Sequence, residues 1–204
     1  MKGKLGNKLP LMEQFYTLQG EGRYSGKPAV FIRLAGCDVG CVWCDVKESW
    51  DEAAHPLIPV NTIVEDVLKT RCSFVVITGG EPTLYDLTEL TLILSSNNIK
   101  IAIETSGTNQ LKGHFDWVTF SPKKFKKPLN EFYSNSNELK VIVFHVSDLQ
   151  WAKDHAAKIS GKCDLYLQPE WSKMDELMPK ILDFIKQNPQ WNLSLQTHKF
   201  IDIP

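Results

Sequence analysis

The stretch GCDVGCVWCD (residues 36–45) places three of the chain's five cysteines, Cys37, Cys41 and Cys44, within eight positions. It comes shortly after the apolar run AVFIRL (29–34), whose β-branched and aromatic residues predict a buried strand. A chain of 204 residues can bury a core large enough to fold without disulfide staples. We therefore expect the three thiols to build a binding site at the end of a strand.

Composition restricts the possible partners of the chain. Its 23 basic and 24 acidic residues leave a net charge of −1, so no overall field favours nucleic acid or a membrane surface. The segment 1–15 has no apolar run long enough for a secretory signal, and no later segment reaches the roughly 18 apolar residues of a membrane span. We expect a cytoplasmic, reducing location, where clustered thiols serve as metal ligands or redox groups.

Short apolar runs alternate with amphipathic segments along the rest of the chain. Strands are predicted at 29–34, 73–78, 99–104, 116–121, 139–144, 164–169 and 191–196. Helices are predicted at 61–71, 86–96, 148–159 and 173–188, with Asn61, Asp86 and Asp148 at helix starts and Pro179 near the start of the last. Continuous apolar strands separated by helices indicate an α/β fold with a parallel sheet. About six βα-like units fit this length, so we expect an incomplete (β/α) barrel, since a closed one needs about 250 residues.

Unusual residues follow the predicted strands. In parallel α/β folds the chemistry lies at the carboxyl ends of the strands. Here GCDVGC follows the first core strand, and TGGEPT (78–83), ETSGT (104–108), SPKK (121–124) and QPEW (168–171) lie at the ends of later ones. We expect these segments to meet at one rim of the sheet. The basic run KKFKK (123–127) is either a solvated loop or an attractant for an anionic ligand.

The C-x3-C-x2-C spacing supplies three ligands. A structural zinc site normally takes four protein ligands, and His55 is the one nearby candidate for the fourth. Cys72 and Cys163 border predicted strands and fit the role of small buried residues. On a [4Fe–4S] cluster, three thiolates leave one iron open to an external ligand.

Cys37, Cys41 and Cys44, with the aromatic Trp43 before the last, resemble the signature of the radical S-adenosylmethionine (SAM) superfamily. The resemblance implies that they hold a [4Fe–4S] cluster whose open iron binds SAM. It also implies that no protein side chain is the radical initiator, because that role belongs to the SAM-derived 5′-deoxyadenosyl radical. TGGEP (78–82) resembles the superfamily motif that binds the amino end of SAM.

Within that superfamily, LQGEG (18–22), TGGEPTLY, SPKK and the tail QTHKFIDIP (196–204) together resemble the 7-carboxy-7-deazaguanine synthase family. The resemblance implies an elaborated, incomplete (β/α) barrel in one radical SAM domain over 1–204. A substrate-binding loop or hairpin is expected at about 13–28, and a cluster loop at about 36–58, capped by the segment 47–56. The implied reaction converts 6-carboxy-5,6,7,8-tetrahydropterin to 7-carboxy-7-deazaguanine with loss of ammonia, in queuosine and 7-deazapurine biosynthesis.

The same resemblance implies site residues and partners. The residues implied for SAM are Gly80, Glu104, Ser106, Ser121, Pro122, Lys123 and Gln168. Those implied for the substrate are Leu18, Gln19, Gly20, Glu21, Arg33, Thr78, His198 and Pro204, the last through a terminal carboxylate that would make the enzyme intolerant of C-terminal tags. Arg33 would pair with the substrate carboxylate as a planar fork. Expected partners are a small-molecule pterin, a flavodoxin or ferredoxin as reductant and a second copy in a homodimer, with neither nucleic acid nor membrane.

Val46 departs from the family pattern. The family commonly has Thr or Ser two residues after the last cysteine, where the hydroxyl can coordinate Mg²⁺, and Val offers no oxygen. Three possibilities remain open for this chain: water and substrate oxygens hold Mg²⁺ alone, Asp45 or Glu48 substitutes, or the enzyme works without it. Two other functions also remain open, an activase of glycyl-radical enzymes and a non-catalytic zinc-binding module.

Overall fold

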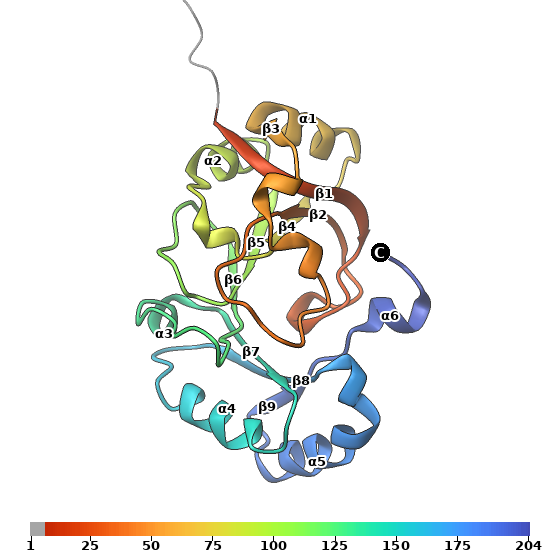
Figure 1. The fold of residues 1–204 in the computed structure, drawn as a ribbon, viewed down its shortest axis with the longest axis vertical. Coiled ribbons are helices and arrows are strands. Elements are labelled where there is room, and N and C mark those ends of the chain that lie inside the picture. Colours follow the sequence, from red (N-terminus) through yellow and green to blue (C-terminus); the bar gives the residue numbers. More distant parts are fainter. Residues whose placement is uncertain (1–6) are drawn as a thin grey trace, which may run out of the picture.

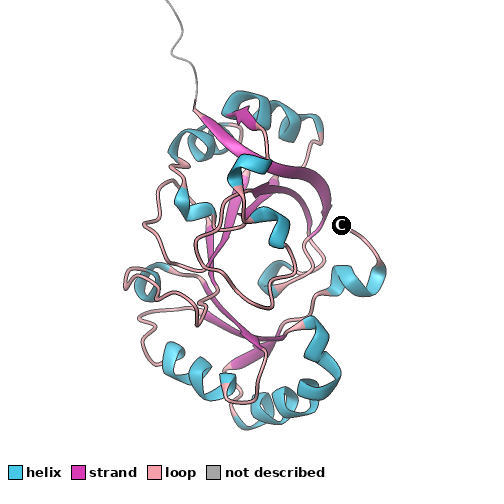
Figure 2. Cartoon of the chain, in the orientation of Figure 1, coloured by secondary structure: helices cyan, strands magenta, loops and turns pink. Residues whose placement is uncertain are grey.

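The computed structural model, which describes residues 7–204, is built on one nine-stranded sheet (Figures 1 and 2). The strands are β1 (Lys8–Leu18), β2 (Pro28–Leu34), β3 (Leu57–Pro59), β4 (Phe74–Gly79), β5 (Lys100–Thr105), β6 (Trp117–Phe120), β7 (Glu138–Val143), β8 (Asp164–Pro169) and β9 (Trp191–Leu193). Their order is β3-β1-β2-β4-β5-β6-β7-β8-β9. Because β3 and β9 form the two ends of this order, the sheet is an open, incomplete barrel.

Seven strands, β2 and β4 to β9, run parallel and coincide with the seven predicted runs. The expected incomplete barrel of about six parallel strands is therefore confirmed, with seven parallel strands in the structure. β1 pairs antiparallel with β2, and β3 antiparallel with β1. The expected hairpin at about 13–28 starts earlier, at Lys8. Its first strand lacked a continuous apolar run, because much of β1 is partly or fully exposed.

The first five helices lie between strands and pack on one face of the sheet, and the sixth follows the last strand. They are α1 (Val60–Lys69), α2 (Thr88–Ser96), α3 (Phe132–Asn135), α4 (Asp148–Ala156), α5 (Met174–Gln187) and α6 (Thr197–Ile201). Short 3-10 turns are η1 (Gly22–Tyr24), η2 (Lys47–Ser49), η3 (Glu52–Ala54), η4 (Pro82–Leu84) and η5 (Trp171–Lys173). In Figure 1, α1 and α2 lie at the top beside β1 and β3, and α4 and α5 at the bottom near β7, β8 and β9. No helix within 7–204 combines the length and apolar character needed to cross a bilayer.

Two of the three residues predicted at helix starts, Asp86 and Asp148, lie at the starts of α2 and α4. Asp86 accepts the backbone N–H of Thr88 (3.0 Å) at the start of α2. Asn61 was expected as a cap but lies inside α1, which begins at Val60 with Pro59 before it. Pro179 sits inside α5 without ending it. A proline there removes one helical hydrogen bond, a cost that the apolar packing of Leu177 and Ile181 offsets.

The two faces of the sheet differ because side chains alternate along a strand. Ile77, Ile103 and Val141 point toward the helices and belong to the main apolar core. Each such side chain, when fully buried, contributes about 1.5–3 kcal/mol. Their neighbours Thr78 and Lys140 point to the opposite, inner face. The inner face thus carries polar side chains near the carboxyl ends of the strands, where the site lies.

Candidate active site

A cavity of about 430 Å³ opens at the carboxyl ends of the parallel strands. This volume suits a small organic ligand. Seventeen of the eighteen residues that the sequence nominated line it: Leu18, Gln19, Gly20, Glu21, Arg33, Cys37, Cys41, Cys44, Thr78, Gly80, Glu104, Ser106, Ser121, Lys123, Gln168, His198 and Pro204. The exception is Pro122, which lies in the turn after β6 and does not line the cavity.

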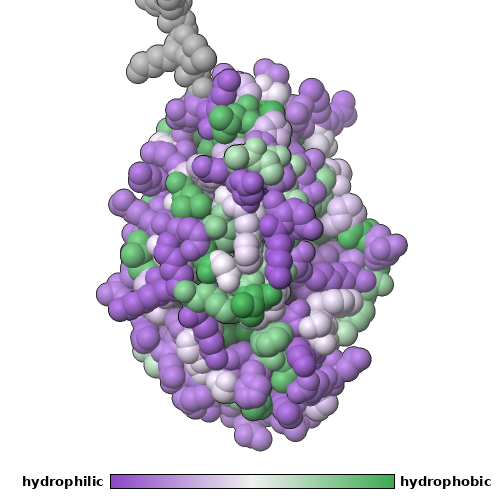
Figure 3. Space-filling model, in the orientation of Figure 1, coloured by the Kyte–Doolittle hydropathy of each residue, from purple (hydrophilic) through white to green (hydrophobic). Residues whose placement is uncertain are grey.

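The cysteine loop (36–45) crosses the mouth of this cavity. In Figure 3, hydrophilic residues cover most of the visible face, with apolar residues scattered among them. The segment 47–56, which follows the loop in sequence, forms η2 and η3 and contributes Trp50 to the lining. Backbone bonds from Gly36 N–H to the Ser49 carbonyl (2.7 Å) and from Cys37 N–H to the Trp50 carbonyl (3.3 Å) hold the two segments together.

Gly80 lets the end of β4 approach the cysteine loop. A Cβ at this position would come within 2.2 Å of the Gly36 carbonyl oxygen and 2.9 Å of the Cys37 Cβ. The backbone N–H of Glu81 donates to that same Gly36 carbonyl (2.8 Å). A side chain larger than hydrogen would therefore force the TGGEP turn away from the thiols.

The three thiols fit a cationic iron–sulfur centre. Burial raises the pKa of the Cys41 thiol to about 11 and that of Cys37 above its usual range. Buried thiolates at neutral pH need a positive centre beside them, and a metal cluster is such a centre. All five cysteines are free, while Cys72 and Cys163 pack against the main apolar core away from the cavity.

Glu81, which the sequence did not assign, joins the TGGEP turn to the end of β5. Its carboxylate is 1% exposed and accepts from Thr83 Oγ1 (2.6 Å), Thr105 Oγ1 (2.6 Å) and the backbone N–H of Ser106 (2.8 Å). The Ser106 hydroxyl also donates to Glu81. The proton of Ser106 is thus used inside the protein, which leaves a lone pair of its oxygen for a ligand.

Lys123 points toward the cavity from the SPKK turn. Its Nζ donates to the Ser121 carbonyl (2.7 Å) and to Ser121 Oγ (2.5 Å), and burial lowers its pKa. The other lysines of KKFKK differ: Lys124 pairs with Asp148 and Lys126 with Asp38. The run therefore divides into one lysine that lines the cavity and a partly paired loop.

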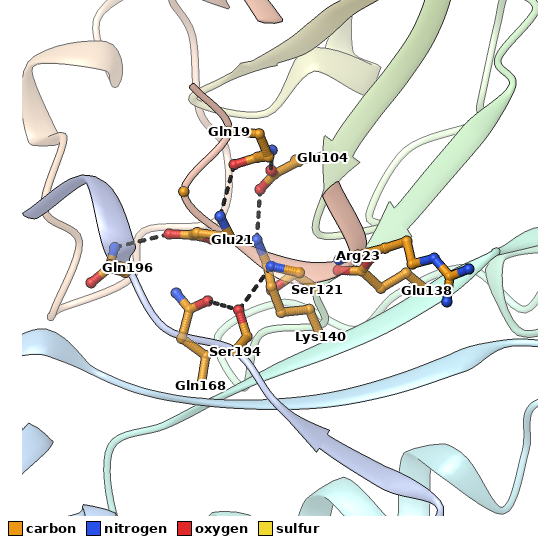
Figure 4. A network of polar contacts seen from close by, with 12 residues as sticks. Gln19, Glu21, Arg23, Glu104, Ser121, Glu138, Lys140, Gln168, Ser194 and Gln196 are labelled. Carbon is orange, nitrogen blue, oxygen red and sulfur yellow. Dashed lines mark hydrogen bonds and ion pairs between the residues drawn. The ribbon is translucent and has the colours of Figure 1, made fainter. Parts of the chain in front are cut away.

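Lys140, Glu21, Glu104 and Gln19 form a buried network that we call the Lys140 cluster (Figure 4). Lys140 Nζ donates to Glu21 Oε2 and to Glu104 Oε2 (2.8 Å). Gln19 Nε2 donates to Glu104 Oε1 (2.9 Å), and the Gln19 side-chain oxygen accepts the backbone N–H of Glu21 (3.0 Å). The four side chains come from the loop after β1, the end of β5 and the middle of β7.

Arg33 and His198 lie on the part of the cavity nearest the N-terminal loop. Arg33 Nε donates to Glu13 (2.5 Å), which leaves its terminal guanidinium nitrogens available, and Arg33 pairs in register with Thr78. Burial lowers the pKa of His198 below its usual range, against the opposing effect of Glu21. The ring packs against Gly20, where a Cβ would come within 2.1 Å of Nδ1.

The C-terminal segment 194–204 closes the same side. Thr197 N–H and Oγ1 both donate to the Gly20 carbonyl (3.0 and 2.9 Å), and Thr17 Oγ1 donates to the Pro204 carbonyl (3.3 Å). Gln168, 3% exposed, accepts from Ser194 Oγ (2.7 Å). The loop after β1 and the C-terminal segment therefore build one wall together.

The residues around Val46 do not fit a protein-held Mg²⁺. Val46 lines the cavity without an oxygen, and Asp45 already accepts from Lys199 (2.8 Å) and Gln196 (3.5 Å). Glu48 does not line the cavity. Within residues 7–204, no three His, Cys, Asp or Glu side chains form a group that could hold a single metal ion.

The zinc alternative required His55 beside the cysteines. His55 Nε2 instead lies 2.8 Å from the Glu48 carbonyl, and the ring is not part of the cavity wall.

Sequence reasoning missed Lys140, Glu81 and Gln196. The signal for Lys140 was present, since a lysine inside the apolar strand LKVIVF (139–144) is a charge in a position that is almost always apolar. Glu81 and Gln196 stood inside motifs that were noted for their neighbours. Apart from Thr83, the hydrogen-bond partners of Glu81 lie 24 or more positions away, and Glu21, a partner of Gln196, lies 175 positions away, so no local pattern revealed them.

Known proteins resemble the chain over nearly its whole length. Residues 31–136 match the model of the radical SAM superfamily. The chain is 50% identical over 199 residues to the 7-carboxy-7-deazaguanine synthase of Flavobacterium psychrophilum, covering 98% of this chain and 94% of the relative. It is 46% identical to the enzyme of that name from Synechocystis sp., covering 95% and 93%. The crystal structure of QueE from Escherichia coli superposes with a TM-score of 0.81 at 34% identity, covering 94% and 95%.

Proposed function

Because the chain belongs to the 7-carboxy-7-deazaguanine synthase family of the radical SAM superfamily, we propose that it converts 6-carboxy-5,6,7,8-tetrahydropterin to 7-carboxy-7-deazaguanine and ammonia. The product differs from the substrate by one ammonia, so the overall step needs no net oxidant or reductant. SAM can therefore be regenerated in each cycle. The product serves queuosine and 7-deazapurine biosynthesis.

One observation carries this proposal: the cavity that the three cysteines line also contains an arginine fork and buried carboxylates. Cys37, Cys41 and Cys44 would hold the [4Fe–4S] cluster. When bound, the cluster and SAM supply the electron and the radical that removes a hydrogen atom from the substrate. SAM would be bound by Gly80, Glu104, Ser106, Ser121, Lys123 and Gln168, with Pro122 shaping the turn that carries Lys123.

The pterin would occupy the side of the cavity near the N-terminal loop. Arg33 presents its free guanidinium nitrogens to the substrate carboxylate, since Glu13 takes Nε alone. Glu21 accepts from ring N–H groups, and neutral His198 and Thr78 add hydrogen bonds. Leu18, Gln19, Gly20 and Pro204 complete the wall.

Neither rival function gains support. The relatives share the synthase name, which disfavours a glycyl-radical activase, and His55 is directed at a backbone carbonyl, which disfavours a zinc site. We further propose a cytoplasmic homodimer that is reduced by a flavodoxin or ferredoxin. Light scattering of the purified protein tests the dimer, and reduction assays with each carrier test the donor. We also propose that any Mg²⁺ requirement is weak, because Val46 offers no ligand.

The decisive experiment incubates reconstituted protein anaerobically with a reductant, SAM and carboxytetrahydropterin, and analyses the products by mass spectrometry. We expect carboxydeazaguanine and ammonia in equal amounts. Protein with a complete cluster that cleaves SAM but forms no carboxydeazaguanine would refute this function.

A further inference from the structure

Lys140 lines the cavity but has no role in the proposed reaction. It is 2% exposed and lies on the inner face of β7, where the neighbouring Leu139 and Val141 face the helices. Its ammonium bridges Glu21, 119 positions earlier, and Glu104, 36 positions earlier (Figure 4). One buried cation therefore joins two segments that are remote in the sequence.

The bridge is part of a closed ring. Starting at Lys140, the contacts run to Glu104, from Glu104 to the Gln19 side chain, from Gln19 to the backbone of Glu21, and from Glu21 back to Lys140. Gln196 adds an outer bond to Glu21 (3.0 Å). A shift of either carboxylate must therefore stretch at least two hydrogen bonds. Closed networks of this kind restrict side chains more than a single ion pair does.

Electrostatics keep the ring charged. Burial opposes the charge on Lys140, yet Glu104, Glu21 and Glu138 together raise its pKa above the ordinary lysine value. Burial likewise opposes the charge on Glu21, but Lys140 and Gln196 bring its pKa below the ordinary value. Lys140 therefore stays protonated at neutral pH and holds both carboxylates.

Glu21 and Glu104 both line the cavity, but they are assigned to different ligands. Under the proposed function, on which this inference rests, Glu21 accepts from the pterin and Glu104 belongs to the SAM site. We propose that Lys140 is a positioning residue that couples the two sites, so that binding of SAM at Glu104 prepares Glu21 for the substrate, and the reverse. In this role Lys140 acts through the two carboxylates that it pairs with.

The coupling has a definite sign. A ligand that contacts one carboxylate restricts its remaining motion further, and the shared ammonium passes this restriction to the other carboxylate. The second ligand then binds a carboxylate that is already ordered, so less conformational entropy is lost when it binds. SAM should therefore tighten substrate binding, and by linkage the substrate should tighten SAM binding by the same factor, on the order of tenfold.

The test measures binding and needs no turnover. Protein with a complete but unreduced cluster is titrated anaerobically by calorimetry with carboxytetrahydropterin, in the presence and absence of SAM. The coupling factor is the ratio of the two dissociation constants. A lost contact weakens binding in both titrations and cancels in this ratio, whereas a lost coupling does not.

Two variants and one control make the test specific. Lys140→Met keeps an unbranched side chain, one atom shorter, and removes its charge. Glu21→Gln keeps Lys140 paired with Glu104, so it preserves the fold even where Lys140→Met does not. Lys124→Met is the control, because Lys124 is also paired with a buried aspartate, Asp148, but does not line the cavity.

We expect a coupling factor of about ten in the wild type and in Lys124→Met. In Lys140→Met and in Glu21→Gln it should fall to about one. A wild-type factor near one, or a wild-type factor retained in either cavity variant, would overturn this inference and leave the proposed function intact. Wild-type protein that binds SAM but no pterin would refute the proposed function, and the inference with it.

Discussion

The cysteine loop and the Lys140 cluster share one cavity but are assembled in opposite ways. The loop takes its three thiols from eight consecutive positions, shaped by a turn and a few backbone bonds. In the cluster, Glu21 and Glu104 precede Lys140 by 119 and 36 positions. The cluster therefore forms only when β5, β7 and the loop after β1 are in place. The cysteine loop supplies the proposed cluster ligands, and the Lys140 cluster positions carboxylates in the cavity wall. Mutations should therefore separate the two.

Breaking the loop should have the largest effect. We expect Cys41→Ala to lose the iron and all synthase activity while the far-ultraviolet circular dichroism and the melting temperature stay close to wild type, because Cys41 contributes little to the apolar core. Iron content, absorbance near ~400 nm and product formation measure this. Cys72→Ala, outside the cavity, is the matched control and should keep its cluster. Residual turnover in Cys41→Ala would show that the ligands are assigned wrongly.

Replacing Glu81, whose carboxylate connects the TGGEP turn to the end of β5, should lower the stability of the protein. Glu81→Gln places an amide where five donors converge on a buried carboxylate. We expect the free energy of unfolding to fall by about 3 kcal/mol in urea titrations. Glu65→Gln, on the exposed side of α1, should change it by less than about 0.5 kcal/mol. Equal effects of the two substitutions would contradict the role given to Glu81.

Mild acid should leave the Lys140 cluster unchanged, because neither Lys140 nor Glu21 should titrate between pH 6.5 and 5. His155, buried among Tyr133, Phe120 and Trp151, does respond, since burial lowers its pKa to about 4. The unfolded chain binds the proton first, at its ordinary pKa of about 6.5. The contribution of neutral His155 to the free energy of unfolding is therefore fully present above pH 6.5. It decreases by about 3 kcal/mol as the pH falls toward 4.

His155→Gln provides the control for this acid effect. It removes the titrating ring, so urea titrations at several pH values should show a flatter profile for the variant between pH 6.5 and 4 than for wild type. Profiles that run parallel would assign the acid sensitivity to other groups.

The smallest effect concerns Val46, beside the last cysteine. Val46→Thr adds one oxygen to the cavity wall, so we expect Mg²⁺ to stimulate the variant more than wild type, by less than about tenfold. Initial rates with and without Mg²⁺ after chelation measure this. Val46→Ala should behave as wild type. An unchanged response in Val46→Thr would show that this position does not govern the metal.

Strands and helices of the parallel part were predictable because their apolar patterns are local. AVFIRL became β2, and LKVIVF covers most of β7. The antiparallel strand β1 was not predicted along its full length, because its first residues, Lys8 to Pro10, pair with β3, which lies far along the chain, and no local pattern indicates that pairing. The cap role of Asn61 failed for a similar reason: Val60 is buried by tertiary packing, so α1 starts one residue earlier than the local signal indicated.

By itself the sequence determined the chemistry of this protein, since the spacing of Cys37, Cys41 and Cys44 and the resemblance of its motifs identify a radical SAM site. Only the tertiary structure decided how that site is organised. Lys140 faces Glu21 and Glu104 because strand alternation turns it to the inner face and because the parallel pairing of β5, β6 and β7 brings the strand ends together. Such contacts depend on sheet order, which no local stretch of residues encodes.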